Sequence, residues 1–373
     1  PFKDVYFTSI IRDKKGRKFS KSLGNSPDPF ELFEEYGTDA VRFGTMLMAP
    51  QGLDVLFSST RLEVGRNFMN KLWNASRFVL MNLEDGNIPE IDLDKEELDI
   101  PERWILSRLQ KSIKAYNRQL NRFHFNEAAK VLYDFTWNDF CDWYIEIAKT
   151  RFYGNDAHAA DVSRATAIQV LRKILAVLHP FAPFISEELW AHVKRADDPD
   201  LIVGQWPQAN DNNIDDTAEK DMELLQKIVT GIRTVRSRMN VPPGSQSELI
   251  AKCDSDMVVF LQKHHTIISA LTQTSSVTAG PDQAKPEQSA TVVIGKNELY
   301  IPLGGLIDLD VEKVRLQKRA DEINGHLMEI SKKLSNEKFI SRAPQSVVDR
   351  EKEKQEEMSA ELEKVNANLE MLQ

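Results

Sequence analysis

A basic segment near the start of the chain carries the side chains best suited to chemistry. Its sequence is Arg17-Lys18-Phe19-Ser20-Lys21-Ser22-Leu23-Gly24-Asn25. Lys18 and Lys21 are three positions apart among small hydroxyl residues, so a mobile loop can present both ammonium groups to one polyanion. Preorganised cations stabilise a triphosphate whose charge grows in the transition state. Most basic runs are solvated surface, so composition alone leaves both interpretations open.

A second candidate site lies on the predicted helix Leu62–Leu83. Its core stripe is Phe68, Leu72, Ala75 and Val79, and a neighbouring stripe is Asn67, Lys71, Asn74 and Phe78. Amides can read base edges, a lysine can meet a phosphate, and an exposed ring can stack on an unpaired base. Arg61 and Arg77 are near enough to assist. The alternative is that Phe78 edges the core and the Asn residues cap or bridge helices.

A third candidate lies at a break between two heptad patterns. Apolar residues advance by four and three from Leu316 to Leu334 and again from Met358 to Leu372, with the break at Asn336–Pro344. Such seams predict an antiparallel hairpin within one chain; one continuous helix dimerising with another chain is the alternative. The cations at the predicted tip are Lys332, Lys333, Lys338 and Arg342.

Hydrophobic periodicity predicts the elements that position these groups. Val5-Tyr6-Phe7 is typical of a strand, and Phe30–Met48 predicts two short helices with a stop at Gly37. Three more long helices follow Leu62–Leu83, and a fifth helix of the series begins with Ser186 as its N-cap. The three long helices are Trp104–Phe123, Asn126–Phe152 and Val162–Leu178. Together they predict an antiparallel bundle.

Beyond the bundle, the pattern changes to a small α+β unit. The predicted helices are Thr217–Arg238 and Ser255–Leu271, and the predicted strands are Ser247–Lys252, Ser276–Ala279, Ala290–Ile294 and Glu298–Pro302. We therefore expect a mainly α chain in four parts. They are 1–58, 59–210 (the bundle), 211–305 (the α+β unit) and 306–373 (the hairpin).

Composition narrows the classes of protein. With 41% apolar and 28% charged residues, the 373-residue chain has a globular balance. The net charge of −9 argues against nucleic-acid binding, but residues 1–25 hold seven Lys and Arg and only two Asp, a distribution that permits local phosphate contacts. No apolar run is long enough for a membrane span. Cys141 and Cys253 form no C-x-x-C pair, which predicts buried thiols, no zinc site and a reducing, cytoplasmic location.

Several motifs together resemble one known family. Lys18–Ser22 resembles the K-M-S-K-S loop of class I aminoacyl-tRNA synthetases, with Phe19 in place of the usual Met. Further motifs resemble its valine, isoleucine and leucine subgroup: Leu23-Gly24-Asn25, Pro27-Asp28-Pro29, Tyr36–Arg42, Asn67–Ala75 and Leu178–Ile185. Lys333–Pro344 resembles the turn of the C-terminal coiled coil in valyl enzymes. Isoleucyl enzymes more often end in a zinc-binding cysteine cluster, which two separated cysteines cannot form.

The resemblance implies the C-terminal part of a valine–tRNA ligase, which activates valine with ATP and transfers it to tRNA(Val). It implies the end of a class I catalytic domain at 1–58, an anticodon-binding bundle and a tRNA-binding coiled-coil arm. Lys18, Ser20 and Lys21 would be catalytic, and Lys18, Phe19, Ser20, Lys21 and Ser22 would hold ATP, with Mg²⁺ accompanying it. The tRNA-binding residues would be Arg61, Asn67, Lys71, Asn74, Arg77, Phe78, Lys332, Lys333, Lys338 and Arg342.

The sequence also departs from the whole-enzyme pattern. None of its seven histidines lies in a His-x-Gly-His motif, the family's other ATP motif. The valine pocket and editing domain are not recognisable either, so we expect this chain alone to be inactive, monomeric and without a metal site. The alternatives are a non-catalytic tRNA-binding protein and a fragment of an isoleucyl or leucyl enzyme.

Overall fold

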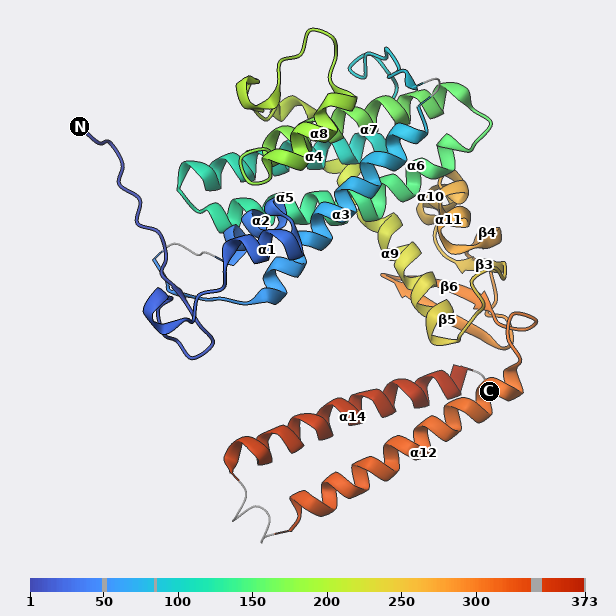
Figure 1. Ribbon diagram of the computed structural model, residues 1–373. Coiled ribbons are helices and arrows are strands. Elements are labelled where there is room, and N and C mark those ends of the chain that lie inside the picture. The colour runs from blue at the N-terminus through green and yellow to red at the C-terminus, as the bar shows by residue number, and fades with distance from the viewer. Residues whose placement is uncertain (49–51, 84–85, 337–343, 372–373) are drawn as a thin grey trace. The chain divides into compact units, whose positions relative to one another are not determined.

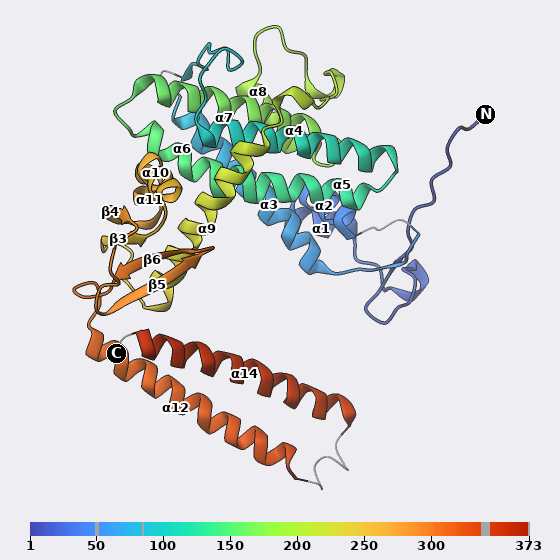
Figure 2. The same cartoon turned by 180° about the vertical axis from the view of Figure 1, so that it is seen from behind.

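A computed structural model describes residues 1–48, 52–83, 86–336 and 344–371. The chain divides into two compact units, Pro1–Glu223 and Leu224–Gln373. Both views in Figures 1 and 2 show a mainly helical chain, as the sequence predicts. No helix in the described ranges is long and apolar enough to cross a membrane.

The first unit begins with a small two-stranded region. Strand β1 (Ile11–Arg12) pairs in parallel with β2 (Val55–Leu56), and the 3₁₀ turn η1 (Lys21–Leu23) lies between them in sequence. The strand predicted at Val5–Phe7 is wrong, because those residues form no strand; Val5 and Phe7 are 68% and 81% exposed. This run of three apolar residues pairs with no strand in the described ranges, so Val5 and Phe7 stay exposed.

Two short helices follow, as predicted around Gly37. Helix α1 (Pro29–Tyr36) begins where the Asp28 side chain accepts a hydrogen bond from the Phe30 amide, and α2 covers Thr38–Met48. Between them Gly37 has φ of 90°, a value that a residue without Cβ adopts at low cost. Helix α2 then packs closely on α3, since a Cβ on Gly65 would collide with the carbonyl oxygen of Ala40.

The centre of the first unit is a bundle in which long helices lie side by side (Figure 1). Its members are α3 (Ser59–Met81), α4 (Ile100–Asn121), α5 (Phe125–Asp134), α6 (Ile145–Phe152), α7 (Ala157–Leu178) and α8 (Pro183–Val193). Apolar stripes at three- and four-residue spacing form its core. Two buried tyrosine hydroxyls are bonded: Tyr116 donates to the Val177 carbonyl at 2.7 Å, and Tyr144 donates to that of Ser163 at 3.1 Å.

The helix predicted over Asn126–Phe152 is continuous but not uniformly α. Residues Phe135–Tyr144 form a π-helical stretch between α5 and α6. Such widened turns change which residues share a face. Phe140 and Tyr144 are nevertheless fully buried, so the aromatic side of this helix reaches the interior.

The N-cap prediction for Ser186 is wrong. Helix α8 begins at Pro183, so Ser186 lies inside it, fully buried, with its hydroxyl 2.9 Å from Nδ1 of His179. The free amides of the first turn are instead met by Asp39 of α2, whose carboxylate accepts from the Ile185 amide at 2.6 Å. A carboxylate from another helix is an equally good cap, and sequence spacing cannot reveal it.

The polypeptide then leaves the bundle through short turns. Two 3₁₀ turns, η4 (Leu201–Val203) and η5 (Asp211–Asn213), precede α9 (Asp216–Arg238), and the boundary between the two units falls within α9.

The second unit contains a four-stranded sheet of order β4-β3-β6-β5. Its strands are β3 (Ser247–Lys252), β4 (Thr274–Gly280), β5 (Ser289–Ile294) and β6 (Asn297–Pro302). Strands β3 and β4 are parallel, and the other neighbouring pairs are antiparallel. The helix predicted over Ser255–Leu271 is two helices, α10 (Ser255–Lys263) and α11 (His265–Thr272), because the helix ends at His264.

The last two helices, α12 (Leu309–Leu334) and α14 (Gln345–Met371), form a hairpin. They run antiparallel, since Arg319 pairs with Glu361 at 2.7 Å and Lys333 with Glu351 at 3.7 Å. The predicted seam on α12 is buried at Leu316, Ala320, Ile323 and Ile330. On α14 the buried line extends back to Val348.

Candidate functional sites

The basic loop is held closed by one carboxylate and one amide. Asp13 accepts hydrogen bonds from Nδ2 of Asn25 at 3.0 Å and from Nε of Arg17 at 2.8 Å, and two backbone amides add to these. Asn25 in turn accepts from the Ser20 amide at 2.9 Å and donates to the Lys18 carbonyl. These bonds, with that of Asn25 first, hold the pKa of Asp13 well below its usual range. The loop acid is therefore charged and already occupied.

The same bonds leave the two lysines of the loop available. Lys18 and Lys21 are exposed, and neither side chain forms an ion pair or hydrogen bond within the described ranges. Lys21 opens the 3₁₀ turn η1, which ends at Gly24 in the left-handed region with φ of 59°. The Ser20 and Ser22 hydroxyl oxygens lie 2.7 Å apart. The arrangement offers two cations and two hydroxyls to a phosphate chain.

An aromatic contact attaches the loop to its base. The ring of Phe19 lies 5.7 Å from that of Phe57, which follows β2. Arg12 of β1 pairs with Asp54 at 2.6 Å and also donates to the Gly16 carbonyl. Phe19 thus fills an apolar position, which is the role that a Met at this place would also serve.

On α3, some side chains of the predicted tRNA-binding stripe are exposed, and one already has an ion-pair partner. Asn67 and Asn74 are exposed, as are Arg61 and Arg77. Lys71 instead forms an ion pair with Asp142, and its ammonium lies 4.4 Å from the centre of the Trp137 ring. The amides and arginines can meet a ligand directly, whereas Lys71 would have to leave its partner.

Phe78 is half-buried at the end of this stripe. Its ring stacks on Phe152 at 6.0 Å, and Nζ of Lys149 lies 5.3 Å from the ring centre. One part of the ring therefore contributes to packing while another part faces solvent. Both interpretations of Phe78 from the sequence have a structural basis.

The acidic side of the π-helical stretch receives cations from neighbouring helices. Arg108 of α4 reaches Asp139 at 2.9 Å, and Lys71 of α3 reaches Asp142. Burial raises the pKa of Asp139, and the Arg108 guanidinium opposes that rise. These acids thus connect neighbouring helices of the bundle.

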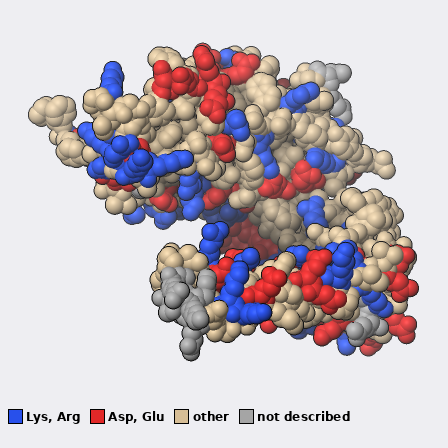
Figure 3. Space-filling view, turned by 60° about the horizontal axis from the view of Figure 1, so that its bottom comes forward, with Lys and Arg blue, Asp and Glu red and all other residues tan. Residues whose placement is uncertain are grey.

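At the hairpin end, two of the four predicted cations can be placed. Lys332 and Lys333 are exposed in the last turn of α12, and Lys333 is 3.7 Å from Glu351. Lys338 and Arg342 lie outside the described residues. On the face of the hairpin that Figure 3 shows, acidic and basic side chains are interspersed.

Other sequence features prove to be structural. The basic run at the end of α9 is partly used internally: Arg233 donates to the Leu271 carbonyl, and buried Arg236 donates to the Ser245 carbonyl at 2.7 Å. Both cysteines are buried and unpaired, as expected. Within the described ranges, no group of three or more His, Cys, Asp or Glu could hold a metal ion.

Two residues that shape the basic loop were not among the predicted site residues. Asp13 and Asn25 flank the basic run and make its internal bonds. Asp and Asn at the two ends of a Gly-containing segment are a recognisable turn signal, since their side chains bond nearby backbone. That signal was present in the sequence.

Three family profiles match separate parts of the chain. Residues 1–58 match "tRNA synthetases class I (I, L, M and V)", residues 102–251 match "Anticodon-binding domain of tRNA ligase", and residues 308–373 match "Valyl tRNA synthetase tRNA binding arm".

Curated relatives match along nearly the whole chain. The valine–tRNA ligase of Fusobacterium nucleatum is 39% identical over 99% of the chain. That of Syntrophotalea carbinolica is 40% identical over 100%, and that of Bacillus subtilis is 38% identical over 99%. The chain spans 42% of the length of each. Among solved structures, the LeuRS of Agrobacterium radiobacter K84, in a ternary complex with tRNA and LeuAMS, is 24% identical with a TM-score of 0.46, covering 65% of this chain and 32% of that one.

Proposed function

Because the chain belongs to the valine–tRNA ligase family, we propose that it is part of an enzyme that activates valine with ATP and transfers it to tRNA(Val). The observation that carries this proposal is an identity of 39% over 99% of the chain with a valine–tRNA ligase. The share of that relative's length, 42%, means that other parts of such an enzyme would supply the remaining groups.

In this proposal the basic loop closes on ATP. Lys21, supported by Lys18, would contact the phosphates, and the Ser20 and Ser22 hydroxyls would donate to phosphate oxygens. Phe19 would hold the loop to its base through Phe57. The fit rests on the free ammonium groups and on Asp13, whose carboxylate already accepts from Asn25 and pairs with Arg17. Mg²⁺ would accompany ATP.

The chemical contribution of these residues is electrostatic. When the valine carboxylate displaces pyrophosphate, negative charge grows on the leaving phosphates. Lysine ammonium groups fixed nearby stabilise that charge more in the transition state than in the bound substrate. The loop would therefore affect the rate of activation more than the affinity for valine.

We also propose two tRNA contacts. On the bundle, Asn67, Asn74 and Phe78 would meet bases of the anticodon loop, while Arg61, Arg77 and Lys71 would meet phosphates. The hairpin at about 307–373 would be a coiled-coil arm that holds the body of the tRNA through Lys332 and Lys333 together with Lys338 and Arg342. Because its seam is closed within one chain, we expect a monomer. The unpaired cysteines support a cytoplasmic location.

The test uses a valine–tRNA ligase that contains this chain. It should catalyse valine-dependent pyrophosphate exchange and charge tRNA(Val), and removing residues 307–373 should weaken tRNA binding and charging while exchange continues. The isolated chain should bind tRNA(Val) and remain a monomer in sedimentation. Charging with isoleucine or leucine in preference to valine would overturn the substrate assignment. Absence of tRNA binding by the intact protein would overturn the whole proposal.

A further inference from the structure

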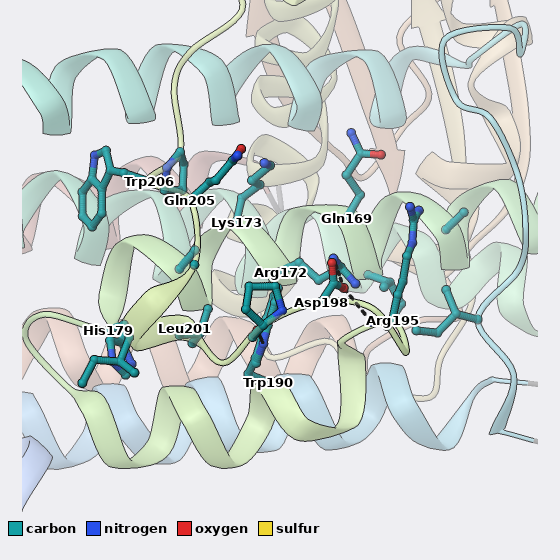
Figure 4. A pocket seen from close by; sticks show the side chains of 18 of the residues that line it. Gln169, Arg172, Lys173, His179, Trp190, Arg195, Asp198, Leu201, Gln205 and Trp206 are labelled. Atoms are coloured by element: carbon teal, nitrogen blue, oxygen red, sulfur yellow. Dashed lines mark hydrogen bonds and ion pairs between the residues drawn. The ribbon is translucent and has the colours of Figure 1, made fainter.

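A cavity in the first unit shares no residue with the basic loop or with the α3 stripe. Its volume is about 760 Å³, and it lies between α7, the end of α8 and the segments 88–93 and 195–207. Figure 4 shows its labelled side chains, with Gln169 and Lys173 projecting from one side of α7. A volume of this size is typical of small-molecule sites.

The walls of this cavity are fixed by many bonds. Arg172 donates to the Val193 carbonyl at 2.7 Å and pairs with Asp198 at 2.6 Å, while its guanidinium lies 4.8 Å from the centre of the Trp190 ring. Nε1 of Trp190 donates to the Pro199 carbonyl at 2.9 Å. The segment after α8 is thus tied to α7 and α8, so the cavity is preformed.

The C-terminal end of the segment 195–207 is also fixed by hydrogen bonds. Nε1 of Trp206 donates to Oδ1 of Asn117 at 2.8 Å, and Nδ2 of Asn117 donates to the Pro207 carbonyl at 3.0 Å. The indole stacks one face on Tyr116 at 6.0 Å and is 37% exposed. A fixed, partly open indole is a ready platform for a flat ring.

Several polar side chains on the cavity have no such structural task. Gln169, Lys173 and Gln205 are exposed, and their side chains make no hydrogen bond or ion pair with any residue in the described ranges. The Arg195 side chain also extends along the rim, while its backbone amide bonds Asp198. Asp198 is the one acid among the described lining residues, and Arg172 already balances it. The side chains available to a ligand are therefore the two cations and the two carboxamides just named.

We propose that this cavity binds a single nucleotide unit, with the base beside Trp206 and the phosphate at Lys173 and Arg195. Stacking on the indole suits any base, and carboxamides such as those of Gln169 and Gln205 can pair with base edges. Exposed Ile202, at 79%, adds apolar surface for the ring or sugar. The unit could come from a free mononucleotide or from an unpaired nucleotide of a bound RNA. The charge excess favours an anion, and the aromatic wall favours a flat one.

The probe is adenosine 5′-monophosphate, titrated into the purified chain and followed by calorimetry and tryptophan fluorescence. We expect a dissociation constant of about 1 mM, typical of a small ligand with few contacts. The double variant Lys173→Gln/Arg195→Gln should weaken binding about tenfold, the loss of charge-assisted phosphate contacts. Ala176→Phe should block binding without changing charge, because Ala176 lines the cavity.

Control variants separate this site from others. Lys130→Gln, on an exposed part of α5, should leave binding unchanged. If binding is lost in Lys21→Gln and retained in Lys173→Gln/Arg195→Gln, the nucleotide occupies the basic loop and the cavity proposal fails. Ribose 5-phosphate that binds as well as the nucleotide would overturn the role of the base. No binding at all would overturn the site.

Saturating tRNA distinguishes the two sources. If tRNA displaces the nucleotide and Lys173→Gln/Arg195→Gln weakens tRNA binding, the unit belongs to RNA. If the nucleotide still binds to the tRNA complex with the same affinity, the ligand is a free mononucleotide. Each result supports a nucleotide site, and melting temperatures of the variants equal to that of the parent show that folding is intact.

Discussion

The basic loop and the α3 stripe both carry a lysine suited to phosphate, but the two lysines are in opposite situations. Lys21 is exposed with no bound partner in the described ranges, and Asn25 and Arg17 occupy the loop carboxylate Asp13. Lys71 is held by Asp142 and lies against Trp137. A cation is free for a ligand only where the local acids are satisfied by other groups, and position in a motif does not tell which case applies.

Several other cations of the bundle are likewise occupied by ion pairs. On α4, Arg103 pairs with Asp215 at 2.6 Å, Lys111 with Asp216 at 2.7 Å and Lys114 with Asp211 at 2.7 Å. These partly exposed pairs each add little stability, on the order of 0–1 kcal/mol. Their main effect is to fix the 211–219 segment against α4 and to remove those cations from ligand binding.

The largest expected effect is at the free lysine of the loop. In a ligase containing this chain, Lys21→Ala should lower the valine activation rate by about two orders of magnitude, roughly 3 kcal/mol of barrier stabilisation, with little change in valine affinity. Single-turnover adenylate formation measures it. Lys14→Ala, an exposed neighbour on the same loop, is the control. An unchanged rate in Lys21→Ala would remove this lysine from the mechanism and end the comparison.

Phe78 should give the next largest effect. Phe78→Ala should weaken tRNA affinity by about 1–3 kcal/mol if the ring stacks on a base. It should also destabilise the fold by about 1 kcal/mol, because the contact with Phe152 is lost. Trp73→Ala, on the same helix and 41% exposed, controls for loss of any surface ring. A lower melting temperature with unaltered tRNA affinity would assign Phe78 to the core alone.

A matched pair on α3 sharpens the contrast between free and bound cations. Arg77→Gln should weaken tRNA binding and flatten its salt dependence by about one phosphate contact, with no change in melting temperature. Lys71→Gln should change tRNA binding less, because Lys71 is paired with Asp142. Filter binding across salt concentrations measures both slopes. If Lys71→Gln has the larger effect, the ion pair opens on binding and the distinction drawn from the free protein is wrong.

The smallest effect concerns a fully buried carboxyl in the bundle. Burial raises the pKa of Glu102, although its Oε1 accepts from Ser163 at 2.6 Å and Nε of Arg151 is 3.8 Å away. Because the pKa of Glu102 is higher in the folded protein than in the unfolded chain, its protonated carboxyl contributes to the free energy of unfolding. That contribution is fully present below the ordinary Glu pKa of about 4.3 and is lost as pH rises through the folded-state pKa.

Glu102→Gln should therefore gain melting temperature relative to the parent as pH rises from about 4 to 8. Arg151 keeps Asp99 at 2.7 Å, which limits the cost of losing Glu102. Exposed Glu97→Gln should show no such trend. A variant less stable than the parent at every pH would mean that the Glu102–Arg151 attraction outweighs the desolvation of the carboxylate.

Periodicity located most helices and strands because a buried face imposes its spacing on the sequence. Strand Ser247–Lys252 has the predicted bounds, and α7 ends at Leu178, just before His179-Pro180. Apolar periodicity did not predict the polar residues that continue a helix seam. On α14, Glu351 and Gln355 continue the seam from Val348 to Met358, and an apolar pattern cannot reveal them.

The sequence by itself determined the family resemblance and the helical class, because motif identity and apolar spacing are local properties of the chain. Only the tertiary structure decided which charged groups are free. Asp39 capping α8, Asp142 holding Lys71 and the cavity beside Trp206 each join residues more than 70 positions apart. An ion pair or a cavity wall depends on which helices become neighbours, and that is set by packing of the whole bundle and not by any local stretch.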